Sequence, residues 1–372
     1  MRIEVKDYSL ILLIGVSSCG KTEFAEKHFF NYEINHTDDP DFTKTLQVMD
    51  GNWLEMDKRQ AVLKQAKINH FRKVAIVFQF QPEELPHSNK TELQAMTNIE
   101  RRINEEGFDE KYYFNSLKEM EEVSLVRTKL PLDERSEHGP FDIIGDVHGC
   151  FGELTKLIRK LGYKQDENGK YHHEENRKLV FVGDVVDRGE SSIPALKLIM
   201  TLCRDNIAYM VLGNHDDRLL RYLKGNAVEV KHGLETTAAE LGKEDEETKK
   251  DILSFLESLP AYYLFDDGKL ACVHAGIKEE YLGKYTKSIK QFCLYGMTTG
   301  EINEMGMPVR LDWADGYKGD TVIVYGHTPY LYVYKRNNAY CVDTGCVFYN
   351  RLSALRYPEM TVVDVRRKKT RK

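Results

Sequence analysis

The sequence lacks any apolar run approaching the roughly 20 residues that a membrane-spanning helix needs. The short apolar stretch near the N-terminus has acidic residues before it and no small, cleavage-type residues after it. That pattern is typical of a buried strand and not of a signal peptide. The seven cysteines are scattered, odd in number and without a CxxC pair. We therefore expect a reduced, cytoplasmic protein without a membrane contact, a disulfide framework or a zinc finger.

The chain also lacks internal repeats, low-complexity tracts and a net positive charge. Its formal net charge is −6, which argues against broad, non-specific binding of nucleic acid. The exception is the basic tail at residues 366–372, for which two interpretations stay open. It is a solvated terminus, or it holds a polyanionic substrate through phosphate contacts.

Two similar beginnings divide the chain. Residues 10–14 form an apolar run before a glycine-rich loop, and residues 141–144 form another before a Gly-Asp pair. Short apolar strands alternate with helical stretches in both halves, so the predicted fold class is α/β. Polar, proline-bounded residues 131–140 predict a linker. We expect one domain over residues 1–130 and a second over residues 141–365.

Five polar motifs in the second half each follow a short apolar run. In chain order they are GDVHG at 145–149, GDVVDRG at 183–189, GNHD at 213–216, VHAG at 273–276 and YGHTP at 325–329. The carboxyl ends of strands are where open α/β sheets gather ligand-binding groups. Asp146 and His148 are two residues apart, so both point to one side of an extended segment and can grip one ion. Carboxylate, imidazole and amide oxygen together suit Mn²⁺, Fe²⁺ or Zn²⁺.

The first half contains a complete G-x-x-x-x-G-K-T loop at residues 15–22, after a predicted strand and before a predicted helix. In such a loop the backbone amides cradle phosphates, the lysine neutralises the outer ones and the threonine reaches Mg²⁺. The apolar run at residues 73–80 is typical of a strand buried in a parallel sheet. We therefore predict a parallel-sheet domain that binds ATP with Mg²⁺. The expected binding residues are Gly15, Ser17, Ser18, Gly20, Lys21 and Thr22.

The five motifs, in this order, resemble those of the calcineurin-like metallophosphoesterase superfamily. The resemblance implies a C-terminal β-sandwich flanked by helices, which would hold two divalent metals. Mn²⁺ is the preferred ion, and Ni²⁺, Fe²⁺ and Zn²⁺ are alternatives. By position, the implied ligands are Asp146, His148 and Asp184 for one ion, and Asp184, Asn214, His274 and His327 for the other. Pro329 stands where the family often has a further histidine, which leaves the first ion with fewer protein ligands.

The same resemblance implies three catalytic roles. His215 resembles the general acid that protonates the leaving oxygen, and Asp216 would orient it. Arg188 resembles the residue that clamps phosphate oxygens, a task that suits its rigid fork of donors. Two divalent metals close together would polarise the phosphate ester and activate water.

Further segments, covering most of residues 141–360, resemble the phosphatase domain of bacterial polynucleotide kinase-phosphatases. They are almost equally similar to a stand-alone bacterial hydrolase of dinucleoside tetraphosphates that cleaves symmetrically. In the kinase-phosphatases an aspartate of a DTGC segment belongs to the phosphatase site, which here implies Asp343. Alternatively, Asp343 only caps a strand end. The P-loop half favours the kinase-phosphatases, because the stand-alone hydrolase lacks such a domain.

The P-loop half also departs from the kinase pattern. Residues 48–52 are similar to the VDxTN strand end of that kinase, but the helical stretch normally found before it is nearly absent. Asp38 is the preferred candidate for the base that would activate a 5′-hydroxyl. Residues 86–90 stand where a lid arginine is expected, with Arg101 or Arg102 as loose substitutes. Phosphoryl transfer depends on such positive charge, so an active kinase and a lost one both stay open.

One main hypothesis and two alternatives follow. The main hypothesis is an end-healing enzyme that removes 2′,3′-cyclic or 3′-phosphates from RNA or DNA ends and carries a polynucleotide 5′-kinase-like half. Its expected partners are RNA or DNA ends, ATP and, optionally, a separate ligase. The alternatives are a symmetrical dinucleoside tetraphosphate hydrolase and a serine/threonine protein phosphatase, each with a non-catalytic nucleotide-binding module at its N-terminus.

Overall fold

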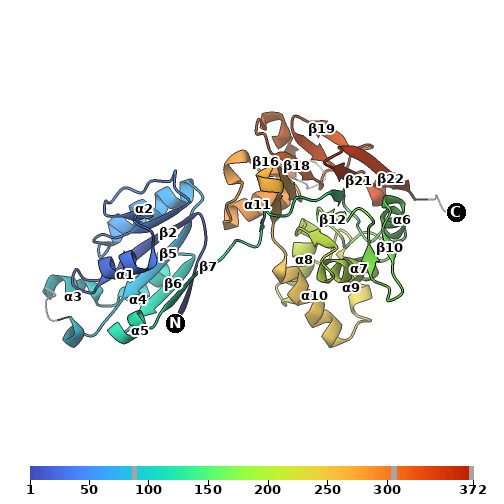
Figure 1. The fold of residues 1–372 in the computed structure, drawn as a ribbon. Coiled ribbons are helices and arrows are strands. Elements are labelled where there is room, and N and C mark those ends of the chain that lie inside the picture. The colour runs from blue at the N-terminus through green and yellow to red at the C-terminus, as the bar shows by residue number, and fades with distance from the viewer. Residues whose placement is uncertain (86–89, 303–307, 368–372) are drawn as a thin grey trace. The chain divides into compact units, whose positions relative to one another are not determined.

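A computed structural model describes residues 1–85, 90–302 and 308–367. The chain forms two compact units (Figure 1). The first comprises Met1–Leu130 and the short segment Gly283–Ile289, and the second comprises Pro131–Leu282 and Lys290–Lys372. The division at residue 130 coincides with the predicted end of the first domain.

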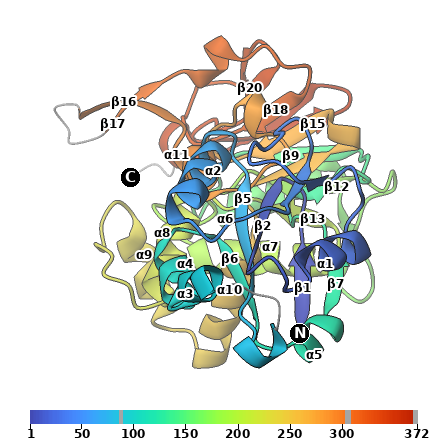
Figure 2. The same cartoon turned by 90° about the vertical axis from the view of Figure 1, so that its left-hand side faces the viewer.

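The first unit is built on a five-stranded sheet in which every strand pairing is parallel. The strand order is β3-β4-β2-β5-β6 (Figure 2). The strands are β2 (Ser9–Ile14), β3 (Ile34–Asn35), β4 (Leu46–Met49), β5 (Arg72–Phe78) and β6 (Glu110–Phe114). All six residues of β2 are buried, because a central parallel strand is covered on both faces. The predicted parallel-sheet domain is therefore present.

Helices cover both faces of this sheet, and alternate residues of β2 face each layer. Ile11 and Leu13 pack with Phe24 of α1, whereas Leu10 and Leu12 pack with residues of α2 and α4. The helices are α1 (Lys21–His28), α2 (Met56–Ile68), α3 (Lys90–Met96), α4 (Ile99–Glu105) and α5 (Leu117–Glu121). A separate parallel pair joins β1 (Arg2–Val5) to β7 (Ser124–Arg127).

The second unit contains two larger sheets. The first, in the order β13-β12-β9-β21-β22, consists of β9 (Phe141–Ile144), β12 (Lys178–Phe181), β13 (Ala208–Met210), β21 (Arg351–Tyr357) and β22 (Thr361–Arg366). The second, in the order β19-β20-β18-β15-β14-β8, consists of β8 (Asp133–Glu134), β14 (Tyr262–Phe265), β15 (Leu270–Val273), β18 (Val322–Tyr325), β19 (Tyr334–Arg336) and β20 (Ala339–Cys341). Phe141 and Ile143 of one sheet share a buried core with Phe265 and Leu270 of the other. This shared core makes the predicted β-sandwich.

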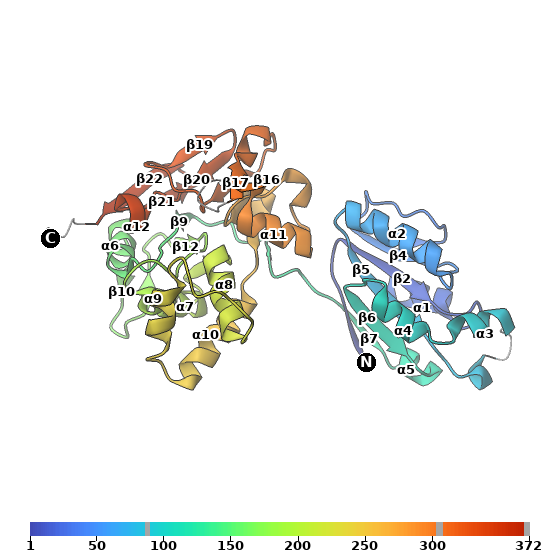
Figure 3. The ribbon, with the colours of Figure 1, turned by 180° about the vertical axis from the view of Figure 1, so that it is seen from behind.

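Helices pack on the outer face of the first sheet, where Ile144 joins the side chains of α6 and α7 in a second core. Figure 3 shows α7, α8, α9 and α10 gathered on this side. The helices are α6 (Phe151–Leu161), α7 (Ser192–Arg204), α8 (Asn214–Leu223), α9 (Leu234–Leu241), α10 (Glu246–Ser258), α11 (Lys287–Tyr295) and α12 (Cys346–Tyr349). Two hairpins pair β10 (Lys164–Gln165) with β11 (Tyr171–His172) and β16 (Met297–Ile302) with β17 (Pro308–Leu311). Short 3₁₀ turns lie at Pro82–Glu84, Asp266–Gly268, Glu279–Tyr281 and Trp313–Gly316.

The segment 131–140 differs from the linker that its composition predicts. Asp133 and Glu134 form β8, which pairs in parallel with Leu264 and Phe265 of β14. Leu132 beside them is buried, so an apolar anchor and a strand pairing hold the segment in the second unit. The polar and proline residues around them hide this short strand from a compositional boundary.

Two predicted features fall partly outside the described residues. They are the lid segment, of which 86–89 are not described, and the basic tail, of which only Arg366 and Arg367 are described. Among the helices within the described ranges, none combines the length and the apolar character needed to cross a membrane.

Candidate metal centre and active site

The five polar motifs lie at the carboxyl ends of parallel strands in both sheets. In one sheet β9, β12 and β13 are parallel neighbours, and in the other β15, β18 and β20 are. The loops after these strands bring six predicted ligands and Asp343 to one side of the sandwich. They carry Asp146 and His148 after β9, Asp184 after β12, Asn214 after β13, His274 after β15, His327 after β18 and Asp343 after β20.

These loops turn sharply at the ligand positions. His148, Asp184 and His327 have left-handed backbones, with φ of 43°, 49° and 73°. Such conformations are unfavourable for residues other than glycine and cluster at functional sites. Glycine is needed at Gly213 and Gly326, because a Cβ there would collide with the carboxylates of Asp184 and Asp146, respectively. The backbone is thus shaped to bring these side chains together.

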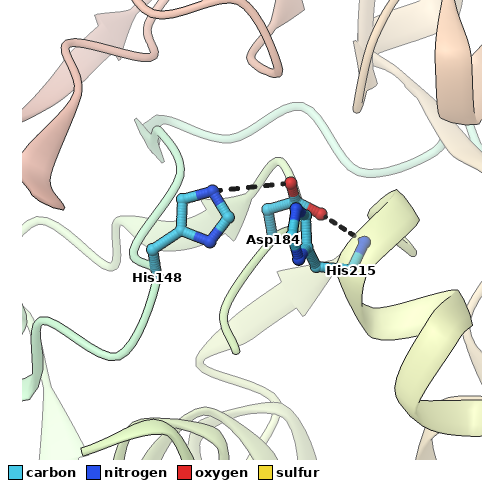
Figure 4. Close-up of side chains that lie close together, drawn as sticks. All are labelled: His148, Asp184 and His215. Carbon is cyan, nitrogen blue, oxygen red and sulfur yellow. Dashed lines mark hydrogen bonds and ion pairs between the residues drawn. The ribbon is translucent and has the colours of Figure 1, made fainter. Parts of the chain in front are cut away.

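The first group of potential ligand atoms surrounds Asp184 (Figure 4). Nε2 of His148 lies 3.6 Å from Oδ2 of Asp184, and the backbone N–H of His215 donates to Oδ1 at 2.8 Å. His148 Nδ1 lies 2.9 Å from the carbonyl oxygen of Val186, so Nδ1 is the donor and Nε2 keeps its lone pair. Burial lowers the pKa of His148 to about 4. The ring is therefore neutral near pH 7, as a metal ligand must be.

A second group lies on the other side of Asp184. His274 Nε2 lies 3.5 Å from Asp184 Oδ2, 2.9 Å from Asn214 Oδ1 and 3.0 Å from His327 Nδ1. His274 Nδ1 faces the carbonyl oxygen of Val182 at 2.9 Å, which again directs the lone pair of Nε2 towards the group. A backbone carbonyl that fixes the ring in this way is typical of metal-binding histidines.

The residues present fit a pair of divalent cations. Asp146, Asp184 and Asp343 are all nearly completely buried, and the carboxylates of Asp184 and Asp343 add to burial in raising the pKa of Asp146. Burial also raises the pKa of Asp343 to about 7. His327 Nε2 is buried without a hydrogen-bond partner among the described residues. Clustered acids and converging lone pairs of this kind are stabilised by a bound cation.

Asp184 belongs to both groups, which makes it the residue that would bridge two ions. His148 belongs to the first group, and His274 and His327 belong to the second. Asn214 faces His274, and Asp146 accepts the backbone N–H of His327 at 3.1 and 3.2 Å. All six predicted ligands are thus brought together. When bound, two such ions supply Lewis-acid polarisation of a phosphate and activation of water.

Asp187, and not Asp216, is the carboxylate that holds the ring of His215. Asp187 Oδ2 lies 2.6 Å from His215 Nδ1, and Thr237 donates to Asp187 Oδ1 at 2.7 Å. Burial acts to raise the pKa of Asp187, but hydrogen bonds from His215, Arg218 and Thr237 lower it below its usual value. Asp187 is therefore an ionised partner for a protonated imidazole.

Asp216 has a different position from the one that its place beside His215 suggests. Its carboxylate accepts the backbone N–H groups of Gly213 and Val185, both at 3.1 Å. It therefore caps α8 and fixes the loop after β12. Burial raises the pKa of Asp216 to about 8. Asp216 supports the geometry of the site without touching the His215 ring.

Two arginines from distant segments face the site. Arg188 Nη1 lies 3.3 Å from His148 Nε2, and its guanidinium lies 5.0 Å from the centre of the Phe348 ring. Arg310 of β17 donates to the carbonyl oxygen of His327 at 3.3 Å. Both line a cavity of about 230 Å³ over the potential ligands. The lining residues are Asp184, Arg188, Asn214, His215, Arg218, His232, Tyr295, Thr298, Arg310 and His327.

Sequence analysis missed Arg310 because no motif surrounds it. Arg310 lies in a segment that is similar to relatives as a whole, but its approach to His327 depends on the hairpin of β16 and β17. Asp343 was predicted, and its Oδ1 accepts the backbone N–H of Gly345 at 2.9 Å. It therefore caps a turn, while its charge also acts on Asp146.

In the first unit, the P-loop lies between β2 and α1 as predicted. Lys21 is buried and its Nζ donates to the carbonyl oxygens of Val16 and Gly15 at 2.7 and 3.0 Å. Thr22 Oγ1 donates to Asp50 Oδ2 at 2.8 Å. Asp50, which follows β4, is the acidic residue in contact with the loop, and sequence analysis gave it no role.

The other residues predicted around the P-loop have separate surroundings. The side chain of Asp38 is 61% exposed and pairs with Lys58 at 3.3 Å. Ser17 Oγ donates to Glu92 at 2.5 Å, and Gly20 has a left-handed φ of 82° just before α1. Arg101 is exposed and pairs with Glu105 on its own helix.

Comparison with known proteins agrees with the second unit. A family model described as calcineurin-like phosphoesterase matches residues 139–357. A protein of Anoxybacillus flavithermus named bis(5′-nucleosyl)-tetraphosphatase PrpE [asymmetrical] is 49% identical over 229 residues, which are 60% of this chain and 93% of the relative. A protein of the same name from Bacillus subtilis is 46% identical over the same shares of both chains.

Among solved structures, a crystal structure of a putative diadenosine tetraphosphatase is similar with a TM-score of 0.47 and 24% identity. The match covers 64% of this chain and 98% of that one. The family model spans all five polar motifs, and the relatives are matched over nearly their whole length. This chain therefore belongs to the calcineurin-like phosphoesterase family.

Proposed function

We propose that the second unit hydrolyses bis(5′-nucleosyl) tetraphosphates unequally, giving a nucleoside triphosphate and a nucleoside monophosphate. The support from relatives is their printed name together with 49% identity over 93% of a relative's length. The bracketed word in that name differs from the symmetrical cleavage that the sequence comparison suggested. The relatives reported above favour this hydrolase alternative over the main hypothesis of RNA or DNA end healing, and none of them is named as a kinase.

The observation that carries the proposal is the pair of arginines on the cavity over the potential ligands. Arg188 and Arg310 come from separate segments and line the same cavity. A single phosphate monoester is held by one such clamp, whereas a polyphosphate chain presents successive anionic groups. Arginine binds each phosphate through parallel N–H donors. Two separated guanidinium groups therefore suit a substrate with several phosphates in a row.

In this proposal each residue has a defined task. The six predicted ligands hold the two ions, with Mn²⁺ as the preferred metal. Arg188 and Arg310 hold the phosphate chain in line. His215 donates a proton to the leaving oxygen, and Asp187 keeps the ring oriented through Nδ1. Because general acids act at hydrogen-bond range, the leaving oxygen lies next to His215 Nε2.

The test is product analysis with diadenosine tetraphosphate in Mn²⁺ buffer. We expect ATP and AMP in equal amounts, separated by anion-exchange chromatography, with no ADP at early times. Oligonucleotides with 2′,3′-cyclic or 3′-phosphate ends and a phosphoserine peptide serve as competing substrates at equal concentration. ADP as the initial product, or faster turnover of an oligonucleotide end or the peptide, would contradict the proposal.

A second function is proposed for the first unit, namely binding of a nucleoside triphosphate with Mg²⁺. The observation that favours it is the contact of Thr22 with Asp50 at 2.8 Å, where two oxygen ligands for Mg²⁺ meet at the end of the loop. Lys21 lies in the same loop at the start of α1. Whether the nucleotide is a kinase substrate or a regulator is decided by transfer of its γ-phosphate to a 5′-hydroxyl oligonucleotide.

The Lys21→Ala variant is expected to bind ATP roughly 10- to 100-fold more weakly than the native protein, because one charge-assisted contact is lost. Calorimetric titration of ATP with Mg²⁺ measures the change. Lys27→Ala, in the last turn of the same helix, is the matched control and should keep the native dissociation constant. Equal affinity in the two variants would show that the loop does not bind ATP.

A further inference from the structure

A second cavity adjoins the one over the potential metal ligands. It has a volume of about 180 Å³, and the two cavities share Tyr295, Arg310 and His327 as lining residues. The lining residues are Ala275, Tyr295, Gly296, Met297, Arg310, Leu311, Asp312, Trp313, Tyr325, His327, Thr328 and Tyr330. We refer to it as the aromatic cavity. A ligand that enters it is continuous with the site of phosphate chemistry.

The rings that line the aromatic cavity are held in place by their neighbours. Trp313 Nε1 donates to the carbonyl oxygen of Ala275 at 2.9 Å, and its ring meets that of Tyr325 at 5.1 Å between centroids. The ring of Tyr330 stacks on Tyr334 at 4.5 Å with an interplanar angle of 17°. Fixed aromatic rings lose little conformational entropy when a flat ligand packs against them. The cavity is thus preformed for a planar ring.

Polar groups at its edges narrow the choice of ligand. Arg310 stands at the boundary of the two cavities, where it meets a phosphate at one side and a ring at the other. Asp312 lines the cavity and places a carboxylate, an acceptor of N–H groups, beside the aromatic rings. A heterocycle with an exocyclic amino group and an attached phosphate matches this combination. Adenosine 5′-phosphate has that chemistry.

We propose that the aromatic cavity binds the nucleobase of the nucleotide whose phosphates lie at the metal centre. The inference rests on the proposed function, because it assigns a place to one nucleoside of the dinucleotide. The base packs against Trp313 and Tyr330, its amino group faces Asp312, and its phosphate passes Arg310. Specificity for a nucleotide over a simple phosphate ester then comes from this cavity.

Neighbouring tyrosines provide a matched pair of variants. Tyr330 lines the aromatic cavity. Tyr332, two residues later, is 65% exposed and lines a different hollow, where the guanidinium of Arg351 lies 4.4 Å from its ring centre. Tyr330→Ala removes one wall of the cavity, and Tyr332→Ala removes a ring of the same size outside it.

The experiment is a fluorescence titration of the Mn²⁺-loaded protein. The chain has two tryptophans, and the other one, Trp53, is completely buried, so Trp313 is the residue that reports on the cavity. We expect AMP to quench the emission and to bind about 10-fold more tightly than ribose 5-phosphate, as stacking of one base implies. In Tyr330→Ala the preference for AMP should fall to less than about 3-fold, and in Tyr332→Ala it should stay native.

Three results would overturn the inference. They are equal binding of AMP and ribose 5-phosphate by the native protein, tighter binding of O-phosphotyrosine than of AMP, and an unchanged AMP preference in Tyr330→Ala. The titration needs no turnover, so it is independent of the substrate test. If the AMP preference is found but diadenosine tetraphosphate is not hydrolysed, the cavity assignment stands and the proposed function fails.

Discussion

The Asp184→Asn variant is expected to lose its bound metals and more than about 100-fold of its phosphatase activity, a larger loss than removal of a group behind a ligand causes. Asp184 is the one residue that belongs to both groups of potential ligand atoms. Replacing its carboxylate by a neutral amide removes a negative charge that both ions would share. Metal content by plasma mass spectrometry and kcat/KM with p-nitrophenyl phosphate measure the two effects.

The asparagine variant is preferred to alanine because it retains the fold. Its side-chain oxygen still accepts the backbone N–H of His215, which Asp184 binds at 2.8 Å. Asp217→Asn is the matched control, because Asp217 lies nearby but pairs with Lys290 at 3.0 Å and Arg221 at 3.2 Å. Asp217→Asn should keep native metal content and activity. Two equivalents of metal retained by Asp184→Asn would contradict the bridging role.

The potential ligands were predictable because each follows its own strand in a local motif. The apolar runs before Asp146, Asp184 and His327 form β9, β12 and β18 close to the expected bounds. Parallel strands bring their carboxyl ends to one edge, so the pattern of single strands is enough to assemble the ligands. The same reasoning placed the P-loop between β2 and α1.

Groups that meet through tertiary structure were not predictable in this way. Asp216 is adjacent to His215 in sequence, yet in the first turn of α8 its carboxylate points back to the N–H of Gly213. The His215 ring instead meets Asp187, 28 positions away. Arg310 and Asp50 likewise reach their sites from segments whose own sequence gives no sign of the contact. A single sequence carries periodicity and motifs but not the distance between remote side chains.

The His215→Ala variant is expected to keep its metals and to lose roughly 10²- to 10³-fold in kcat on phenyl phosphate, within the usual range for a lost general acid. Phenolate is a poor leaving group, so its departure depends on a proton from His215. p-Nitrophenolate leaves readily without one, and a nucleotide phosphate that leaves a tetraphosphate is already a stabilised anion. We therefore expect a smaller loss on p-nitrophenyl phosphate and on diadenosine tetraphosphate than on phenyl phosphate.

The dependence on the leaving group separates this role from metal binding. His215 has a ring nitrogen within 4.8 Å of ligand atoms of His148 and Asp184, so a ligand role would also be consistent with distance alone. A lost ligand would lower metal content and slow all three substrates alike, whereas a lost acid slows them in the order of their leaving groups. Asp187→Asn should reproduce the order with a smaller effect, because the ring remains but its charged partner at 2.6 Å is gone.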